Sequence, residues 1–458
     1  MWRRMGIALL LGWIGASSAR ADTLLVGPPP ARFSSVSEAI AAARAGDTIR
    51  VLPGTYAGDL RIDKPLTLEG VSAPVLRGTG RGSVVTVTAD HCTVRGFVIE
   101  HSGGDLTTED SGLLLKAGDC AIENNELRDV LYGIYLYQAG GNRLRGNVVS
   151  GRRELEVGER GAGLHLWNSP NNLIEDNTIR DARDGLYIQA CSGTIARRNR
   201  VRDVRYGLHY MNSDDNRFED NLFEHNVAGA AIMYSQRITL RGNAFAHNRG
   251  FSSFGILFQD CAAITAEENF ILDNATGIFA EALRQSAFRR NVIAENDLAI
   301  QMFGNADQLV FAANNFIDNL SPLHVVGRRT NTRWQADGRG NYWSEYDGYD
   351  LDGDGVGDVP HKVQNVFEYL EGNYPRLRLY LNSPAAQALA AAEQRFPILR
   401  GAPETDAAPL MRPVALRFSP DARPPRAASG APLAAVSLLA ASVALAALWA
   451  SRFPGGAR

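Results

Sequence analysis

The stretch that decides the fold covers residues 177–226 and reads NTIRDARDGLYIQACSGTIARRNRVRDVRYGLHYMNSDDNRFEDNLFEHN. An asparagine followed two residues later by an apolar residue recurs in it every 22 residues, at Asn177, Asn199 and Asn221. A glycine that opens an alternating apolar run recurs with the same spacing, at Gly185 and Gly207. Two independent motifs with one period indicate a repeat architecture rather than an ordinary compact domain.

The asparagine motif extends outward from this stretch in both directions. Two of the gaps are longer, by 8 residues after Asn147 and by 4 after Asn243. The extra residues fall in the polar or glycine-rich segments 152–161 and 249–254, where we expect loop insertions. The recurring asparagines are Asn125, Asn147, Asn177, Asn199, Asn221, Asn243, Asn269 and Asn291.

Apolar and polar residues alternate with period 2 within each repeat, which predicts short strands with one face inward. A helical repeat would need about 33 residues. Parallel strands joined by crossovers are almost always right-handed. The sequence therefore predicts an all-β fold, a right-handed single-stranded parallel β-helix over residues 61–330. The expected inner columns are Ile134, Leu164, Leu186, Leu208 and Leu136, Leu166, Ile188, Tyr210, Ile232. We expect the asparagines to form a turn ladder, since Asn tolerates the left-handed conformation and its amides can stack.

The flanking regions predict export and two caps. Residues 1–21 have the basic, apolar and small-residue regions of a signal peptide, so the periplasm is the expected compartment. Residues 22–60 form an N-terminal cap, with a helix over Val36 to Arg44 that begins at Ser34 or Ser35. The expected C-terminal units are a cap with an Asp-rich loop (331–383), a helix (384–396), a Pro-rich linker (397–432), a candidate transmembrane helix (433–451) and a tail (452–458).

The segment 433–451 is uncharged and just long enough to span a bilayer of about 30 Å, which predicts an anchor in the cytoplasmic membrane. Because it is mostly alanine, a peripheral or partner-packed helix is the alternative. The formal net charge of −3 and the lack of a basic stripe argue against nucleic acid. Four cysteines do not make a disulfide framework, although Cys92 and Cys120 are close enough in phase to touch.

The Asp-rich loop resembles the ligand spacing of an EF-hand. Asp350, Asp352, Asp354 and Asp358 occupy ligand positions 1, 3, 5 and 9, while His361 stands where the bidentate Glu belongs. We expect either a Ca²⁺ loop that stabilises the C-terminal cap or a plain acidic turn.

Soft metal ligands gather on the outer face of one strand column. His209 and Met211 are two residues apart and therefore share a face, and Met233 follows Met211 by one period. His165 occupies the His209 column two coils earlier. Thioether sulfur with imidazole is a ligand set that selects Cu(I). Because neighbouring positions are aromatic, a protein-docking surface is the alternative interpretation, and both can hold.

A second histidine pair, His225 and His247, stands one period apart on the turn after the asparagine motif. Stacked coils are about 4.8 Å apart, so the rings could share a copper ion. The alternative is that histidine merely replaces the aspartate usual at this polar turn.

β-Helix enzymes that process polysaccharides carry paired carboxylates or a basic residue in a groove along one sheet. The acidic residues here recur in phase, which is more typical of a solvated turn than of a catalytic pair. We therefore expect no enzymatic activity, with a lyase, hydrolase or epimerase as the alternative. The residues concerned are Asp129, Asp181, Asp203, Asp273 and Glu295.

Several motifs resemble those of the NosD family. They are Gly46-Asp-Thr-Ile with Pro53-Gly-Thr-Tyr56, the 22-residue coils, Gly340-Asn-Tyr-Trp-Ser-Glu-Tyr-Asp-Gly-Tyr-Asp-Leu-Asp-Gly-Asp-Gly355, the segment Leu381-Asn-Ser-Pro-Ala to Ala391-Ala-Glu-Gln-Arg-Phe-Pro397, and Pro409-Leu-Met-Arg-Pro413. The coils and the Asn-Tyr-Trp-Ser loop are common in exported β-helix proteins, whereas the last two segments are more specific.

The resemblance implies a periplasmic, non-catalytic copper relay that matures the copper centres of nitrous oxide reductase. The implied partners are the membrane and ATPase subunits of an ABC transporter, a copper-donating lipoprotein and the reductase. The resemblance supplies no ligand motif, so the proposed copper ligands rest on side-chain chemistry alone.

Overall fold

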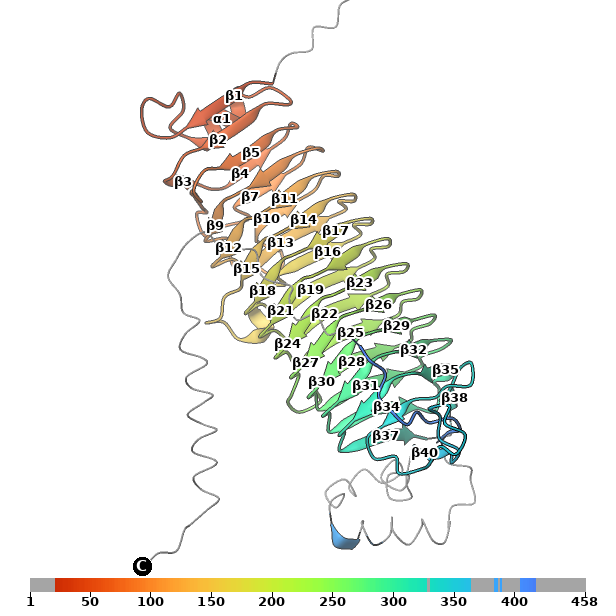
Figure 1. Cartoon of the computed structure of the whole chain (residues 1–458). Helices are drawn as coiled ribbons and strands as arrows, with labels where there is room; N and C mark the ends of the chain where they lie inside the picture. The colour runs from red at the N-terminus through yellow and green to blue at the C-terminus, as the bar shows by residue number, and fades with distance from the viewer. Residues whose placement is uncertain (1–20, 328–329, 364–382, 386–387, 389–403, 417–458) are drawn as a thin grey trace, which may run out of the picture. The chain divides into compact units, whose positions relative to one another are not determined.

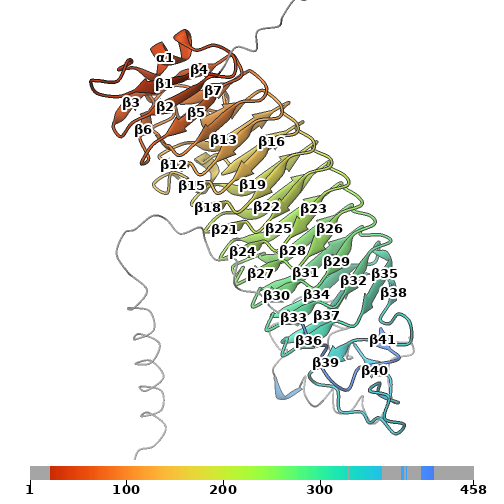
Figure 2. The same cartoon turned by 45° about the horizontal axis from the view of Figure 1, so that its top comes forward.

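The computed structural model describes residues 21–327, 330–363, 383–385, 388 and 404–416. Within these residues the chain winds into a parallel β-helix whose coils stack in sequence order (Figures 1 and 2). Each full coil adds one strand to each of three sheets, called A, B and C in the order in which a coil passes through them. The predicted fold class is confirmed.

The strands of each sheet follow one another in register along the solenoid. Sheet A comprises β1 (Thr23–Val26), β2 (Thr48–Val51), β5 (Thr67–Gly70), β8 (Thr93–Arg95), β11 (Ala121–Glu123), β14 (Arg143–Arg145), β17 (Leu173–Glu175), β20 (Ile195–Arg197), β23 (Arg217–Glu219), β26 (Thr239–Arg241), β29 (Thr265–Glu267), β32 (Ala287–Arg289), β35 (Asp307–Ala312) and β38 (Asn331–Arg333). Sheet B comprises β3 (Thr55–Ala57), β6 (Val75–Arg77), β9 (Val98–Glu100), β12 (Glu126–Arg128), β15 (Val148–Ser150), β18 (Thr178–Arg180), β21 (Arg200–Arg202), β24 (Leu222–Glu224), β27 (Ala244–Ala246), β30 (Phe270–Leu272), β33 (Val292–Ala294), β36 (Asn315–Ile317) and β39 (Tyr342–Trp343). Sheet C comprises β4 (Leu60–Ile62), β7 (Val85–Val87), β10 (Ser111–Leu115), β13 (Tyr132–Tyr137), β16 (Leu164–Trp167), β19 (Asp184–Gln189), β22 (Tyr206–Met211), β25 (Ala228–Met233), β28 (Phe254–Gln259), β31 (Thr276–Glu281), β34 (Leu298–Phe303) and β37 (Ser321–Val326).

A short helix, α1 (Val36–Ala42), covers the first coil and packs on β1, β2 and β4. It begins after Ser35, whose Oγ accepts a hydrogen bond from the Glu38 amide at 3.5 Å, as expected for an N-cap. The helix prediction is confirmed, although the helix ends before Arg44. Lys64 Nζ donates to the carbonyl of Ile40 at 3.0 Å, which satisfies a terminal carbonyl of the helix.

Apolar side chains fill most of the solenoid interior. The inner-column residues predicted from the sequence, among them Leu186 and Leu208, are fully buried. The glycine that recurs at the start of the strands β10 to β31 of sheet C is explained by packing. A Cβ at Gly207 would lie 2.5 Å from the carbonyl oxygen of Gly229 and 2.8 Å from the ring of Phe223. The recurring glycine and the apolar run that follows it therefore have one cause, which is the close approach of successive coils.

The asparagine ladder exists, but its backbone differs from the prediction. The left-handed residue is the one before each asparagine, such as Asp220 with φ 53° before Asn221. The asparagine itself points inward, where its Oδ1 accepts hydrogen bonds from the preceding coil and its Nδ2 donates to the next asparagine. Tolerance of the left-handed conformation is thus not the reason for Asn here. The side-chain amide is selected because it both donates and accepts.

The ladder ends at a segment that composition did not predict to be packed. Residues 404–416 lie within the predicted linker, yet they close the last coils and contribute β41 (Thr405–Asp406), which pairs with β40 (His361–Lys362). The fully buried Asp406 accepts from the Asn341 amide at 2.7 Å and from Trp343 Nε1 at 3.0 Å. Leu410, from the Pro-Leu-Met-Arg-Pro motif, bridges to Tyr342. These residues form the C-terminal cap.

All four cysteines are buried free thiols. The Cys92 amide donates to Cys120 Sγ at 3.4 Å, so these two residues touch as expected. Cys191 and Cys261 share a column and are separated in it by Ser213 and Ser235.

The predicted signal peptide and the segment 433–451 lie outside the described residues, as does most of the helix predicted over 384–396. No helix among the described residues is long and apolar enough to cross a membrane.

Candidate functional site

The outer face of sheet C carries the soft ligands. Strand pairing places His209 beside Tyr187 and Ala231, and it places Met211 directly beside Met233. The neighbours of His209 in the chain, Leu208 and Tyr210, are fully buried inside the solenoid. The alternation therefore turns His209, Met211 and Met233 outward. The thioethers of two adjacent strands and the imidazole two residues away lie on one face.

A buried carboxylate holds the histidine of this group. Asp184, the first residue of β19, is fully buried, and its Oδ2 lies 2.9 Å from His209 Nδ1. Arg205 donates to both carboxylate oxygens, through Nε at 2.9 Å and Nη2 at 2.7 Å. Burial raises the pKa of Asp184, but the bonds from His209 and Arg205 outweigh it and keep the pKa below its usual range. Asp184 is therefore an ionised acceptor.

Sequence reasoning missed Asp184 and Arg205, although a signal was present. The residues in register with Asp184 along sheet C are uncharged. The position of Asp184 holds an uncharged residue in these other coils, so its charge is a departure from the repeat. An alignment of the coils with one another would have revealed it. Those residues are Tyr206, Ala228, Phe254, Thr276 and Leu298.

His165 lies in the same outward column two coils before His209. Its ring lies 4.5 Å from the rings of both Tyr135 and Tyr187, and neither ring nitrogen has a hydrogen-bond partner. Burial lowers the pKa of His165 to about 3, so the imidazole is neutral at ordinary pH. Tyr187 separates His165 from His209. The two histidines consequently lie on one face but are too far apart to bind one ion together.

His225 and His247 lie on the turn between sheets B and C. Their rings are stacked, with centroids 5.2 Å apart and planes 14° from parallel. His247 Nδ1 also lies 2.7 Å from Asp273 Oδ2. A metal ion must lie in the plane of an imidazole that binds it, and it cannot lie in two stacked planes at once. This geometry brings the rings together but does not make them joint ligands without a rotation.

The recurring acidic residues form one column on this same turn, and each has a positive φ. The left-handed conformation and the exposure of this turn explain the recurrence of short polar residues there. The column offers no carboxylate pair that differs from its neighbours. The residues are Asp129 (φ 50°), Asp181 (59°), Asp203 (56°), Asp273 (50°) and Glu295 (57°).

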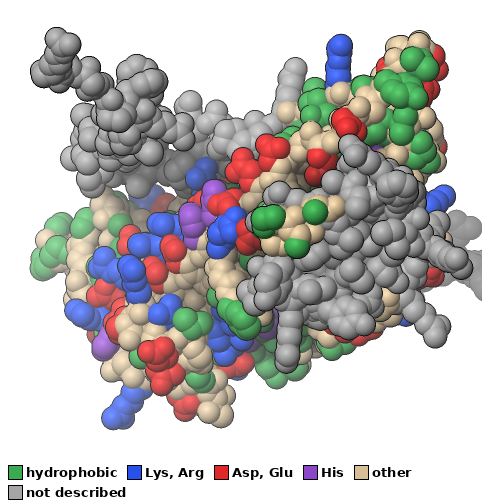
Figure 3. Space-filling model, turned by 90° about the horizontal axis from the view of Figure 1, so that it is seen from below, with side chains coloured by type: hydrophobic (Ala, Val, Ile, Leu, Met, Phe, Trp, Pro, Cys, Tyr) green, Lys and Arg blue, Asp and Glu red, His purple; other side chains and the backbone are tan. Residues whose placement is uncertain are grey.

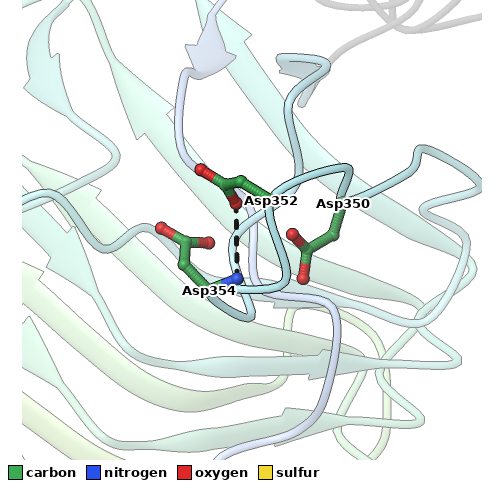
Figure 4. Close-up of side chains that lie close together, drawn as sticks. All are labelled: Asp350, Asp352 and Asp354. Atoms are coloured by element: carbon green, nitrogen blue, oxygen red, sulfur yellow. Dashed lines mark hydrogen bonds between the residues drawn. The ribbon is translucent and has the colours of Figure 1, made fainter.

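The Asp-rich loop brings three carboxylates together (Figure 4). Oxygens of Asp350, Asp352 and Asp354 all lie within 4.8 Å of one another. Several of these oxygens already accept backbone amides, including that of Gly355 at Asp350 Oδ2, at 2.9 Å. Asp358 accepts from the Leu351 amide at 2.6 Å. These bonds are those of a tight acidic turn, and calcium binding here stays a prediction.

A polar hollow of about 620 Å³ opens beside the two methionines. Its lining includes Asn212 and Tyr234, which directly follow Met211 and Met233, together with Asp214, Gln236 and Arg284. On the face that Figure 3 shows, acidic and basic side chains lie next to each other with histidines among them. Most of the side chains that line the hollow are polar.

Comparison with solved structures finds the same fold in sugar-processing enzymes. The A-module of the Azotobacter vinelandii mannuronan C-5 epimerase AlgE6 superposes with a TM-score of 0.52 at 13% identity, covering 66% of this chain and 92% of that one. The catalytic domain of a GH87 alpha-1,3-glucanase gives 0.55 at 10% identity, covering 72% and 70%. At these identities the likeness concerns the fold alone.

Sequence comparison is more specific. Residues 149–348 match the family described as "Periplasmic copper-binding protein (NosD)". A "Probable ABC transporter binding protein NosD" from Pseudomonas aeruginosa is 32% identical over 405 residues, which are 85% of this chain and 94% of the relative. The protein of the same description from Stutzerimonas stutzeri is 30% identical over 380 residues, or 79% and 86%. The chain therefore belongs to the NosD family, whose sequence model describes periplasmic copper-binding proteins.

Proposed function

We propose that this protein is a non-catalytic copper-delivery scaffold of the periplasm, which carries Cu(I) on the outer face of sheet C. The observation that carries the proposal is the direct pairing of Met211 with Met233 beside His209. Two thioethers and one imidazole favour Cu(I) over harder ions. The family description supports copper as the cargo.

The arrangement suits transfer better than storage. Three ligands on the face of a sheet leave one side of the ion uncovered. A ligand of the next protein can attack there before the first ligands have left. His165, neutral and set among tyrosines, would extend the path along the same column toward the N-terminus.

The partners follow from the family. The relatives' description as ABC transporter binding proteins supports docking on such a transporter, with its membrane and ATPase subunits. We propose further that a copper-donating lipoprotein loads the site, that nitrous oxide reductase receives the ion, and that the C-terminal segment 433–451 keeps the scaffold at the cytoplasmic membrane. The hollow beside Met211 and Met233 is a natural approach for a donor or acceptor.

The test replaces Met211 and Met233 together with leucine, which preserves apolar area and removes both sulfur atoms. The doubly substituted protein should lose Cu(I) in competition with a chromophoric Cu(I) chelator under reducing conditions. X-ray absorption of the unchanged protein should show sulfur and nitrogen neighbours. Met302→Leu is the matched control, because Met302 is fully buried on the inner face of β34.

Cu(I) binding that survives the double substitution, together with full metallation of the reductase, would reduce this face to a contact surface for partner proteins. A loss of Cu(I) equal in Met302→Leu would show that general disturbance of the solenoid, rather than ligand removal, is responsible.

A further inference from the structure

Charged side chains on the outer faces of sheets A and B are arranged with opposite signs next to each other. In sheet A, arginine and glutamate alternate without exception in the column that runs from Arg50 to Arg289. The outer column of sheet B begins in the same way, because Glu100 lies between Arg77 and Arg128 and forms an ion pair with each. Opposite charges on neighbouring strands are the stabilising arrangement.

Arg180 and Arg202 depart from this arrangement. They are the last residues of β18 and β21, they are paired in register, and both are exposed. Like charges directly opposite each other in a sheet are destabilising. Arg180 comes within 3.7 Å of Asp181, and Arg202 within 3.2 Å of Asp203. Exposed ion pairs of this kind contribute little to stability, so they do not explain why two arginines lie side by side.

The loop insertion 152–161 adds more positive charge at the same place. It projects from the solenoid beside β18 and β21 (Figure 1) and brings Arg153 and Arg160 next to them. Arg160 is held by backbone carbonyls, since its Nε donates to Leu155 and its Nη2 to Arg153, both at 2.8 Å. Arg153 comes only within 4.0 Å of Asp181. Among the described residues, the loop therefore fixes the Arg160 guanidinium without a carboxylate at ion-pairing distance.

The side chains of the two strands and the loop line a hollow of about 420 Å³, which we call the arginine hollow. Its four guanidiniums and two carboxylates leave a net charge of +2, and the glutamates of the loop do not line it. A phosphate monoester carries about −1.5 to −2 charges at pH 7 and three acceptor oxygens, and arginine binds such a group through paired N–H donors. A carboxylate has one charge and two oxygens, so it matches the hollow less well. The lining residues are Arg153, Arg160, Arg180, Asp181, Arg202 and Asp203.

We propose that the arginine hollow binds a phosphate monoester, with Arg180 and Arg202 as its main ligands and the loop 152–161 as its wall. The bound phosphate offsets the repulsion between the two arginines. The inference goes beyond the proposed function, because it concerns neither copper nor the outer face of sheet C. A small phosphorylated molecule and a phospholipid headgroup with a terminal phosphate share this chemistry, and the experiment separates the two sources.

The experiment measures the binding of two probes to the purified full chain, with and without the double substitution Arg180→Gln and Arg202→Gln. The probes are inorganic phosphate, followed by calorimetry, and phosphatidylcholine vesicles that contain phosphatidic acid, followed by flotation. At least one probe should bind, and the double substitution should weaken its binding at least about tenfold. Vesicle binding that the double substitution removes identifies a lipid headgroup. Phosphate binding without vesicle binding identifies a small phosphorylated ligand.

Arg77→Gln together with Arg128→Gln is the matched control. It removes the same charge from the same column of sheet B, where Glu100 already neutralises both arginines, so affinity should change by less than about twofold. The Arg180 and Arg202 variant should unfold at no lower temperature than the unaltered protein, because the substitution relieves a repulsion between exposed side chains. A lower unfolding temperature would contradict the repulsion from which the proposal is argued.

Three further results would overturn the proposal. The first is that neither probe binds to the unaltered protein, and the second is that the control weakens binding as much as the double substitution does. The third is that a polyglutamate peptide binds more tightly than either phosphate probe and loses its binding in the double variant. That result would assign the arginine hollow to an acidic segment of a partner protein.

Discussion

Removing one asparagine from the ladder should weaken the solenoid far more than its small side chain implies. Asn221 lies midway along the ladder, and its Oδ1 accepts from the Asn199 amide at 3.0 Å and from Asn199 Nδ2 at 2.9 Å. Its Nδ2 donates to the Ala196 carbonyl and to Asn243 Oδ1, both at 2.9 Å. Asn221→Ala deletes these four bonds in a fully buried layer.

The expected loss follows from what remains unsatisfied. The buried backbone amide of Asn199 loses its acceptor, which costs about 1–3 kcal/mol. The two lost Nδ2 bonds cost about 1 kcal/mol each. Asn199 Nδ2 keeps its bond to the Ile174 carbonyl, so it adds little. The free energy of unfolding should fall by about 3–5 kcal/mol, a large part of the stability of a typical domain.

Two measurements check this result. Urea unfolding gives the total loss, and amide hydrogen exchange locates it, because the coils of a solenoid interact mainly with their neighbours. Exchange should speed up around residues 195–225 and stay slow near the N-terminal coils. The control is Glu224→Gln, on the outer side of the same coil. A loss below about 1 kcal/mol, or exchange as slow as in the control, would refute the hydrogen-bond argument.

Three further predictions concern charge, activity and location. Burial raises the pKa of Glu175, but bonds from Arg197 and Arg143 outweigh it and lower the pKa to about 2 from the ordinary 4.5. The stability that this depressed pKa supplies is present above pH 4.5 and lost as the pH falls toward 2, so Glu175→Gln should flatten the acid limb of a urea-midpoint profile. Purified protein should leave uronate polymers intact, and depolymerisation that Asp184→Asn abolishes would establish the enzyme alternative. Truncation before Pro432 should release the protein from the membrane fraction, and equal fractionation of both forms would remove the anchor from the proposal.

The sequence predicted the solenoid because packing enforces the period. A Cβ at Gly207 has no room, and Asn221 needs an identical amide in the next coil, so each motif must return once per coil. The first coil was not recognised as part of the solenoid. Its strands β1 and β2 carry neither motif, since α1 covers the end instead.

A C-terminal cap was predicted over residues 331–383, but the part that residues 404–416 contribute to it was missed, for a different reason. Residues 404–416 have no periodicity, and their contacts are with Asn341 and Trp343, some 65 residues earlier in the chain. Asn341 is the last asparagine of the ladder, and its amide groups need an acceptor, which the Asp406 carboxylate supplies. This need is apparent only from the folded structure. Composition identified this segment as Pro-rich and could not supply that partner.

The proposed copper face was partly visible in the sequence. Period and alternation together placed His209, Met211 and Met233 on one face, because both are local properties of the chain. The supporting pair Asp184 and Arg205 has no ligand motif in the sequence and stands out only as a departure from the repeat.

In a solenoid those departures are the more informative signal. Equivalent positions in successive coils have the same packing environment. A residue that lowers stability at one of these positions therefore needs an explanation other than packing. Asp184 places a buried charge where neighbouring coils have an uncharged residue. Arg205 neutralises this charge by donating to both carboxylate oxygens, and its guanidinium lies over the ring of Tyr206. Asp184 in turn contacts His209 through one hydrogen bond at Nδ1. The buried charge of Asp184 on β19 and the paired thioethers of β22 and β25 both lie next to His209, and this agreement makes the outer face of sheet C the place to test first.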